Sequence, residues 1–308
     1  MSINKIHMEE GSLGQYYYKQ SWVSLFRPLT LSGTISPALA GTAIAGWQHE
    51  IHFSLFLGVL FGALLIQAAT NLLNDYFDFK NGQDKEKWTT EPMSGQHLPA
   101  HHTLPIIAGV MMTVAAFIGI WLGSVTSVWL IAVGAAGVAA GYAYSAGKRS
   151  LAARGLGELT AAVFLGPVIT LIAFTVQGGR ISAVILGVSL VFASLIASMI
   201  LTNNIRDLEK DRLFRNTLAN RLGKSGAVKL LAVLLAVPYL VVIVLVMLQR
   251  LPVVSLLVLG AIPVAVMLYR SYAPDASKKQ QQLGMKWAAR HHWVFGLLLT
   301  ATLLIPYS

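Results

Sequence analysis

Long apolar runs separated by short polar connections dominate the chain. A helix needs about 20 apolar residues to cross about 30 Å of hydrocarbon. Lipid offers no partners for backbone N–H and C=O groups, and the alternating pattern of barrel strands is absent, so such runs must be helical. The pattern predicts an all-α polytopic membrane protein, a bundle of nine transmembrane helices in a single domain over residues 1–308. The nine runs cover roughly 28–47, 52–74, 104–123, 127–145, 158–177, 182–202, 226–248, 252–269 and 288–306.

The composition supports a membrane protein. The chain is 55% hydrophobic and only 12% charged, whereas a soluble domain carries about 25% charged residues. It has no cysteine, which excludes disulfides and thiolate chemistry. Residues 1–20 are polar and lack the apolar core and cleavage pattern of a secretory signal peptide. We expect them to form a short cytoplasmic lead.

The cations indicate how the protein lies in the bilayer. If the nine helices alternate in direction, one side carries 21 of the 23 Lys and Arg residues, and only Arg180 and Arg250 fall on the other. The positive-inside rule then places the N-terminus and the long loops in the cytoplasm, as in a bacterial cytoplasmic membrane. The net charge of +10 is explained by this topology, so no nucleic acid partner is expected.

Two acidic stretches end apolar runs on this cytoplasmic side. In each, a Thr-Asn pair is followed four residues after the Asn by an Asp, so the two side chains share a helix face. Carboxylates are costly beside hydrocarbon and are therefore expected to be functional. The oxygen-bearing side chains are Asn71, Asn74, Asp75, Asp78 and Asp84 in the first stretch, and Asn203, Asp207 and Asp211 in the second.

Such donors suit magnesium. Mg²⁺ prefers one or two carboxylates together with water and phosphate oxygens, and two clusters could hold two ions that clamp a diphosphate. The motif of a Thr-Asn pair followed by an Asp occurs twice, 132 residues apart, which suggests two related helical halves. The alternative is that these are solvated helix ends with the intrahelical pairs Asp207–Lys210 or Asp211–Arg215.

Basic and aromatic residues accompany the acids. Arg206, Lys210 and Arg215 interleave with the second stretch and could bind diphosphate oxygens, although topology alone also explains cations there. Tyr144 and Lys148 end the fourth run, where they could contact the substrate or serve as interface anchors.

Other sequence features give no further candidate for a catalytic or metal-binding site. The pairs His101-His102 and His291-His292 are adjacent residues whose side chains diverge on a helix, so we expect solvated residues there and not metal ligands. No P-loop, dinucleotide fingerprint, HExxH or nucleophile elbow is present.

A cation-coupled secondary transporter is the alternative from another class. The repeated motif and the prolines inside apolar runs, Pro167, Pro238 and Pro263, are typical of transporters with broken helices. A transporter would place its acids near the midplane of the bilayer, whereas here the acids end the runs. The pattern therefore favours a site at the cytoplasmic rim.

The motifs resemble a known family. Asn-Asp-xx-Asp after the second run, Tyr-xxx-Lys after the fourth and Asp-xxx-Asp after the sixth resemble the UbiA superfamily of intramembrane aromatic prenyltransferases. Phe26-Arg27-Pro28 at the first run and Gly155-Leu156-Gly157-Glu158 extend the resemblance over nearly the whole chain. It is strongest to the 1,4-dihydroxy-2-naphthoate polyprenyltransferases of bacterial menaquinone synthesis.

The resemblance implies a Mg²⁺-dependent transfer of a polyprenyl group from its diphosphate to a small aromatic acceptor. An apolar bundle suits this chemistry because an allylic cation must be kept from water. In this reading the catalytic residues are Asp75, Asp78, Asp207 and Asp211, and these four together with Asp84 bind the metal. The substrate-binding residues are Asn71, Asn74, Tyr144, Lys148, Asn203, Arg206, Lys210 and Arg215.

Two segments depart from the pattern of that branch. Where the branch has a glycine-rich stretch with an arginine, this chain has Lys87-Trp88 followed by Thr89 to Met93. Where the branch tends to have Gly-Arg-Lys-Thr, this chain has Phe214-Arg215-Asn216-Thr217. Both changes remove positive charge or flexibility near the expected diphosphate, which suggests another acceptor or weaker activity.

Overall fold

The protein is described by a computed structural model, which covers residues 16–91, 97–147, 149–212 and 214–307. The predicted cytoplasmic lead therefore lies outside the described residues as far as residue 15. The elements in chain order are β1 (Tyr17–Tyr18), α1 (Trp22–Phe26), η2 (Pro28–Thr30), α2 (Ser32–Ala45), α3 (Phe53–Lys80), η3 (Lys85–Lys87), β2 (Trp88–Thr89), η4 (His101–Thr103), α4 (Leu104–Val125), α5 (Trp129–Ser145), α6 (Gly157–Val163), η5 (Phe164–Val168), α7 (Ile169–Thr175), α8 (Ala183–Arg206), α9 (Leu208–Asp211), α10 (Leu218–Met247), η6 (Val253–Ala261), α11 (Ile262–Arg270) and α12 (Lys278–Leu303).

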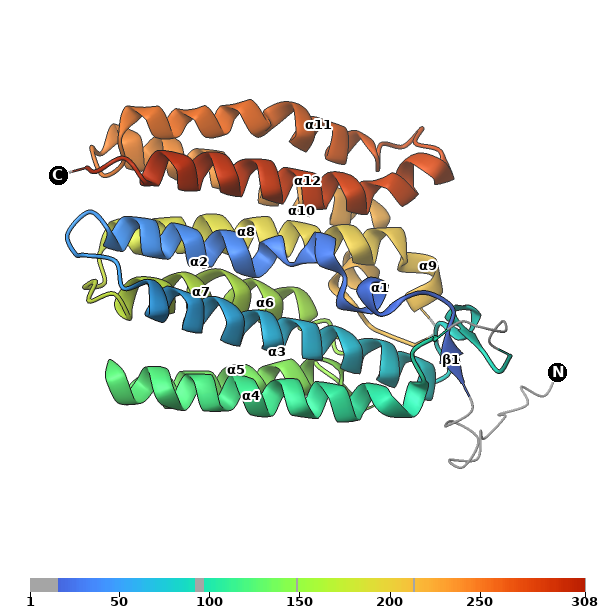
Figure 1. Ribbon diagram of the computed structural model, residues 1–308. Coiled ribbons are helices and arrows are strands. Elements are labelled where there is room, and N and C mark those ends of the chain that lie inside the picture. The colour runs from blue at the N-terminus through green and yellow to red at the C-terminus, as the bar shows by residue number, and fades with distance from the viewer. Residues whose placement is uncertain (1–15, 92–96, 148, 213, 308) are drawn as a thin grey trace.

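The long helices lie side by side and form one bundle (Figure 1). Helices α4 and α5 form one side of it, α11 and α12 form the opposite side, and α2, α3, α6, α7 and α8 lie between them. The short elements β1, α1 and α9 lie at one end of the bundle, and the chain leaves α12 at the other end. This arrangement brings the end of α3 and the end of α8 to the same end of the bundle.

The structure confirms a mostly helical membrane protein, and helical segments overlap each predicted apolar run. Within the described residues, six helical segments are long and apolar enough to cross a membrane: Phe53–Lys80, His101–Val125, Gly157–Thr175, Ala183–Arg206, Leu218–Met247 and Val253–Arg270. Trp129–Ser145 is apolar but shorter, α2 has 14 residues, and α12 begins with the polar residues Lys278 to Gln282. The protein is therefore multi-pass, while the count of nine spans stays a prediction.

Small residues let the central helices approach closely, which is how helices gain packing energy in lipid. A Cβ atom on Gly41 of α2 would meet the carbonyl of Thr170 on α7. A Cβ on Gly166 would lie 2.6 Å from the backbone nitrogen of Ala193 on α8. Gly166 belongs to η5, a π-helical turn that also contains Pro167. The predicted 158–177 run thus bends at this turn, where it packs on α8.

A small aromatic core covers the end of the bundle where α3 ends. The strand β1 pairs antiparallel with β2, with Tyr18 opposite Trp88. The Trp88 ring lies 4.9 Å from Phe79 and 5.0 Å from His101, centroid to centroid. Trp88 is 4% exposed. This packing holds the loop that follows α3 in place and so positions the acid and the lysine it carries.

Three of the four paired histidines are buried, so the prediction of solvated residues was wrong for them. His101 contacts the Tyr76 carbonyl through Nε2 at 3.1 Å, and His291 Nε2 lies 2.9 Å from the Tyr239 hydroxyl. His292 is 1% exposed. The prediction failed because neighbouring helices cover α12 on the face that carries both residues.

Candidate active site

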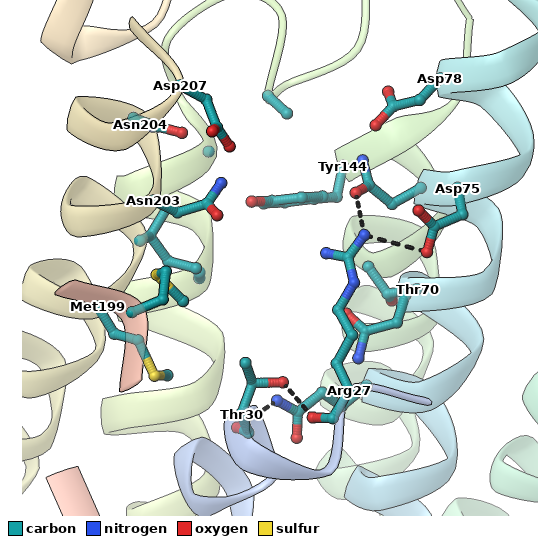
Figure 2. A pocket seen from close by; sticks show the side chains of 18 of the residues that line it. Arg27, Thr30, Thr70, Asp75, Asp78, Tyr144, Met199, Asn203, Asn204 and Asp207 are labelled. Atoms are coloured by element: carbon teal, nitrogen blue, oxygen red, sulfur yellow. Dashed lines mark hydrogen bonds and ion pairs between the residues drawn. The ribbon is translucent and has the colours of Figure 1, made fainter. Parts of the chain in front are cut away.

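The two acidic stretches line opposite walls of one cavity. It has a volume of about 680 Å³. Figure 2 shows Asp75 and Asp78 on α3 facing Asn203 on α8 and Asp207 just after it, with the Tyr144 ring between the two walls. The structure therefore brings together residues that lie far apart in the chain, while their roles stay predictions.

The last turns of α3 form the first wall. Asn71, Asn74, Asp75 and Asp78 follow the i, i+3, i+4, i+7 spacing that places side chains on one helix face, and all four line the cavity. Asp75 is 3% and Asp78 is 8% exposed. After α3 the Gln83 N–H donates to the Asp78 carbonyl at 2.8 Å, which folds the loop back over the helix end.

Asp84 reaches the cavity through an unusual backbone conformation. Its φ is 51°, in the left-handed region, which Asp adopts more readily than most residues. Lys87, one 3₁₀ turn later, forms an ion pair with Asp84. The left-handed residue thus redirects the chain so that its own carboxylate and the lysine both line the cavity.

The end of α8 and the short helix α9 form the second wall. Arg206 Nη2 donates to Asn203 Oδ1 at 2.8 Å and to Asp207 Oδ2 at 2.6 Å. Asp207 lies outside α-helical geometry, at φ −97° and ψ 11°, and separates the two helices. The Asp211 N–H donates to the Asp207 carbonyl at 2.8 Å, which keeps one helical turn between the two acids.

The cations of the second stretch pair with acids of the first. Lys210 forms ion pairs with Asp84 and Glu86, the latter at 2.7 Å. Arg215 pairs with Asp78 and donates to Gln83 at 3.1 Å. The alternative of intrahelical ion pairs is not borne out, because Lys210 pairs with Asp84 and Glu86, and Arg215 pairs with Asp78.

Sequence reasoning missed two cations that pair with acids of the first wall. Arg27 Nη2 donates to Asn74 Oδ1 at 3.0 Å and to Asp75 Oδ2 at 3.1 Å, as Figure 2 shows for Asp75. Lys87 Nζ lies 3.5 Å from Asp75 Oδ1. Arg27 belongs to the Phe26-Arg27-Pro28 motif, which was the available signal, but nothing in its spacing relates it to α3. Lys87 opened a segment that seemed to depart from the family pattern.

The remaining predicted residues divide as follows. Tyr144 lines the cavity, and its ring points between the walls in Figure 2, so it is not merely an interface anchor. Lys148 lies outside the described residues.

Asn204, beside Asn203, donates to buried Glu158 at 2.7 Å, which fixes the orientation of the Asn204 amide. Asn216 is exposed and does not line the cavity, whereas its neighbour Arg215 does.

Two acids outside the helical spans have altered pKa values. Burial disfavours the charged form of Asp84, but Lys87 and Lys210 outweigh burial and lower its pKa to about 2. Burial raises the pKa of Asp211 to about 6, although Arg215 acts in the opposite direction. The Asp84 carboxylate therefore stays ionised at any physiological pH. The Asp211 carboxyl has a pKa close to physiological pH.

The donor chemistry of the two walls fits Mg²⁺. Carboxylate and amide oxygens are the ligands that this ion prefers, and it leaves several positions to water and phosphate oxygens. Across the described part of the chain, no three His, Cys, Asp or Glu side chains cluster closely enough to hold a metal ion by themselves. A metal here would therefore take one or two carboxylates from a wall and complete its shell with water and substrate oxygens.

Comparison with known proteins identifies the family. The sequence matches the UbiA prenyltransferase family over residues 34–290. The chain belongs to this family. The resemblance inferred from the motifs is thus confirmed, and UbiA membership does not favour the transporter alternative.

Two bacterial relatives of this UbiA protein share one name. It is 34% identical over 305 residues to the 1,4-dihydroxy-2-naphthoate octaprenyltransferase of Bacillus subtilis, covering 97% of this chain and 95% of that one. The protein of the same name from Mycobacterium tuberculosis is 34% identical over 227 residues, or 73% of this chain and 78% of the other. A UbiA homolog from Archaeoglobus fulgidus bound to GPP and Mg²⁺ has a TM-score of 0.62 over 91% of this chain and 99% of that one, at 12% identity. This last likeness shows the fold.

A second cavity of the UbiA bundle adjoins the first. It has a volume of about 110 Å³ and lies between α3, α4, α5 and the α6–α7 segment. Ile66, Gly137, Phe164 and Leu165 line both cavities. The lining of the second is made only of glycine and apolar residues. The charged cavity thus lies next to a smaller apolar one, which we call the apolar groove.

Proposed function

We propose that this UbiA family protein transfers a polyprenyl group from its diphosphate to 1,4-dihydroxy-2-naphthoate in a Mg²⁺-dependent reaction. The main observation that supports this proposal is that two acidic walls face each other across one cavity. The naphthoate is proposed because the Bacillus subtilis relative that bears this name is similar over nearly the whole chain.

The reaction balances without a protein base. The C1–O bond of the prenyl diphosphate breaks and diphosphate leaves with the electron pair. The ring carbon that bears the carboxylate forms the new bond to C1. The electrons of the bond to the carboxylate then restore the aromatic ring as CO₂ departs. The protein must therefore stabilise a leaving diphosphate and exclude water from an allylic cation.

Residues of both walls would bind the metal and the diphosphate. Asp75, Asp78 and Asp84 on one wall and Asp207 and Asp211 on the other would hold Mg²⁺, with Asn71, Asn74 and Asn203 binding its waters or the substrate. When bound, Mg²⁺ would neutralise charge on the diphosphate oxygens. In the structure, Lys210 and Arg215 form ion pairs with acids of the first wall. With substrate and Mg²⁺ bound, the metal would take their place beside these carboxylates, and the two cations would donate to the diphosphate.

The apolar groove would hold the polyprenyl tail. It adjoins the charged cavity and offers only apolar walls and glycines. A tail that lies there places C1 at the junction between the two cavities, beside Tyr144 and Phe164. The groove also keeps the reacting carbon away from bulk water. We further propose that the charged end of the bundle faces the cytoplasm, as the distribution of cations predicts.

A direct assay tests the proposal. Purified protein in lipid vesicles should release diphosphate and form prenylated naphthoquinol from a polyprenyl diphosphate and 1,4-dihydroxy-2-naphthoate when Mg²⁺ is present. Asp75→Ala or Asp207→Ala should abolish both products. Asp275→Ala is the matched control, since Asp275 is exposed in the turn before α12. Full activity of either cavity variant would refute the proposal.

A cell-based experiment tests the acceptor separately. Deletion of the gene should remove menaquinone from the cells, and the wild-type gene should restore it. Prenyl transfer by the purified protein without any change in menaquinone would point to another aromatic acceptor.

A further inference from the structure

One cation at the cavity differs from the others in its surroundings. The six cations that line the cavity are Arg27, Lys87, Arg206, Lys210, Arg215 and Lys286. The first five form ion pairs with acids of the cavity or its rim. Lys286 is the one cavity cation without an ion pair in the described part of the chain, a comparison that leaves out position 148. Its charge is therefore available to a ligand.

Lys286 lies on a third wall of the cavity. It belongs to α12, where Met285 and Ala289 line the cavity beside it. The other sides of the chamber include Met199 of α8 and Leu29 of η2. Lys286 is exposed, so this wall forms part of the mouth of the cavity, and the acids that would bind Mg²⁺ belong to other elements.

Exposed apolar side chains also line the cavity. Val23 of α1 is 63% exposed and Leu29 is 57% exposed, and both line the cavity. Exposed aliphatic side chains together with one ammonium group that has no ion pair match a flat aromatic molecule that carries one anionic substituent. A prenyl diphosphate is a poorer match, because its several charges need several cations and metal ions.

The charge along α12 supports binding of an anion. The chain has no Asp or Glu from Ala276 to Ser308, while Lys278, Lys279, Lys286 and Arg290 all lie in the half of α12 nearest the cavity. Arg290 is held over the Trp287 ring at 4.9 Å. An acceptor that approaches along α12 therefore meets cations and no competing carboxylate on that helix.

We infer that Lys286 binds the carboxylate of the aromatic acceptor at the mouth of the cavity and guides the acceptor toward the prenyl carbon. The inference rests on the proposed function, because it assigns the acceptor of that reaction to the α12 wall. Lys286 acts here as a specificity-determining residue for anionic acceptors. It takes no part in releasing the diphosphate.

Steady-state kinetics in vesicles of neutral lipid test this role. Lys286→Gln should raise the KM for 1,4-dihydroxy-2-naphthoate about fivefold, the size expected for a partly exposed ion pair, and leave kcat and the KM for prenyl diphosphate unchanged. Lys286→Arg should restore the wild-type KM. Lys224→Gln is the matched control, an exposed lysine of α10 that does not line the cavity, and it should behave like the wild type.

An acceptor without the carboxylate provides a second readout. Naphthalene-1,4-diol can be prenylated at a carbon that carries hydrogen, with loss of a proton instead of CO₂. The wild type should prefer the carboxylated acceptor at low ionic strength, and both added salt and Lys286→Gln should reduce that preference. If Lys286 merely anchors α12 at the membrane interface, neither added salt nor Lys286→Gln will change the preference for the carboxylated acceptor.

Each outcome separates this inference from the proposed function. Absence of any prenyl transfer by the wild type would overturn both. Normal transfer with an unchanged acceptor KM in Lys286→Gln would overturn the inference alone. A rise in the KM for prenyl diphosphate would assign Lys286 to the diphosphate instead. An effect seen only in vesicles that contain anionic lipid would assign it to a lipid phosphate, which also overturns the inference.

Discussion

Arg215 of the second acidic stretch donates a hydrogen bond to Asp78 of the first, although 137 residues separate them. Side chains of Arg215 and Asp78 are 14% and 12% exposed. The pair therefore connects the two walls of the cavity across a partly dehydrated space. In the proposed reaction the same guanidinium would donate to the diphosphate once Mg²⁺ neutralises Asp78.

Replacing Arg215 should weaken substrate binding. Arg215→Gln removes a charge-assisted donor, which is worth about 1.5–3 kcal/mol, so the KM for prenyl diphosphate should rise at least tenfold. Arg212→Gln is the matched control because Arg212 is an exposed cation of the same loop. The measurement is the rate of diphosphate release against prenyl diphosphate concentration. Similar kinetics for the two variants would contradict the role assigned to Arg215.

Replacing Lys87 should change metal and substrate binding in opposite directions. Lys87 pairs with Asp75 and Asp84, so Lys87→Met leaves these carboxylates less neutralised and should tighten Mn²⁺ binding to the substrate-free protein. The same change removes a donor for the diphosphate and should weaken binding of prenyl diphosphate. Exposed Lys85→Met is the control. Titration calorimetry measures both affinities, and equal shifts in both would be inconsistent with a shared site.

Filling the apolar groove should shorten the accepted prenyl chain. Gly134 lines the groove, and a Cβ there would meet no atom within 4 Å, so Gly134→Phe adds bulk without a backbone clash. Gly134 lies ten residues from Tyr144 along α5, or about 15 Å. The variant should keep activity with geranyl diphosphate and lose most activity with an octaprenyl donor.

Gly109 offers the control for the groove. A Cβ on Gly109 also meets nothing within 4 Å, but this residue lies on the exposed face of α4 and does not line the groove. Gly109→Phe should therefore leave the chain-length preference unchanged. Competition between geranyl and octaprenyl diphosphate in one reaction measures the preference. Equal use of both donors by Gly134→Phe would place the tail elsewhere.

The apparent affinity for Mg²⁺ should fall on acidification through pH 6. Burial raises the pKa of Asp211 to about 6, so its carboxyl is neutral below that pH and a proton competes with the metal. The Mg²⁺ concentration that gives half-maximal activity should rise as the pH is lowered from 7 to 5. Asp84, with a pKa of about 2, stays ionised over this range.

Asp211→Asn isolates the contribution of that carboxyl. Asparagine keeps one oxygen ligand but does not titrate, so the variant should need more Mg²⁺ at pH 7 and show a smaller change between pH 7 and 5. A variant with the full wild-type pH dependence would assign the titration to another group.

Local patterns in the sequence predicted the helices and placed the acids of each wall on one short stretch of the chain. Asn71, Asp75 and Asp78 share a face because helical spacing places them there, and no distant contact is needed for that conclusion. The apolar runs likewise predicted the helices, because lipid leaves the backbone no other way to satisfy its hydrogen bonds. The left-handed Asp84 and the break at Asp207 were not predictable from these periodic patterns.

The partners of charged residues could not be predicted in the same way. Lys210 lies three residues after Asp207, and a local rule pairs them, yet Lys210 reaches Asp84 and Glu86. Arg27 was assigned to topology and proved to contact Asn74 and Asp75. Such choices depend on which helix ends meet in the bundle, and nothing in the local spacing contains that information.

The sequence by itself determined a helical membrane protein with two acidic stretches, a family resemblance and a proposed metal-dependent chemistry. The tertiary structure decided that these stretches face each other across one cavity, that cations of one pair with acids of the other, and that an apolar groove adjoins this cavity. The reason is physical: periodicity acts over a few residues along the chain, whereas ion pairs and cavities arise where helices distant in sequence pack together.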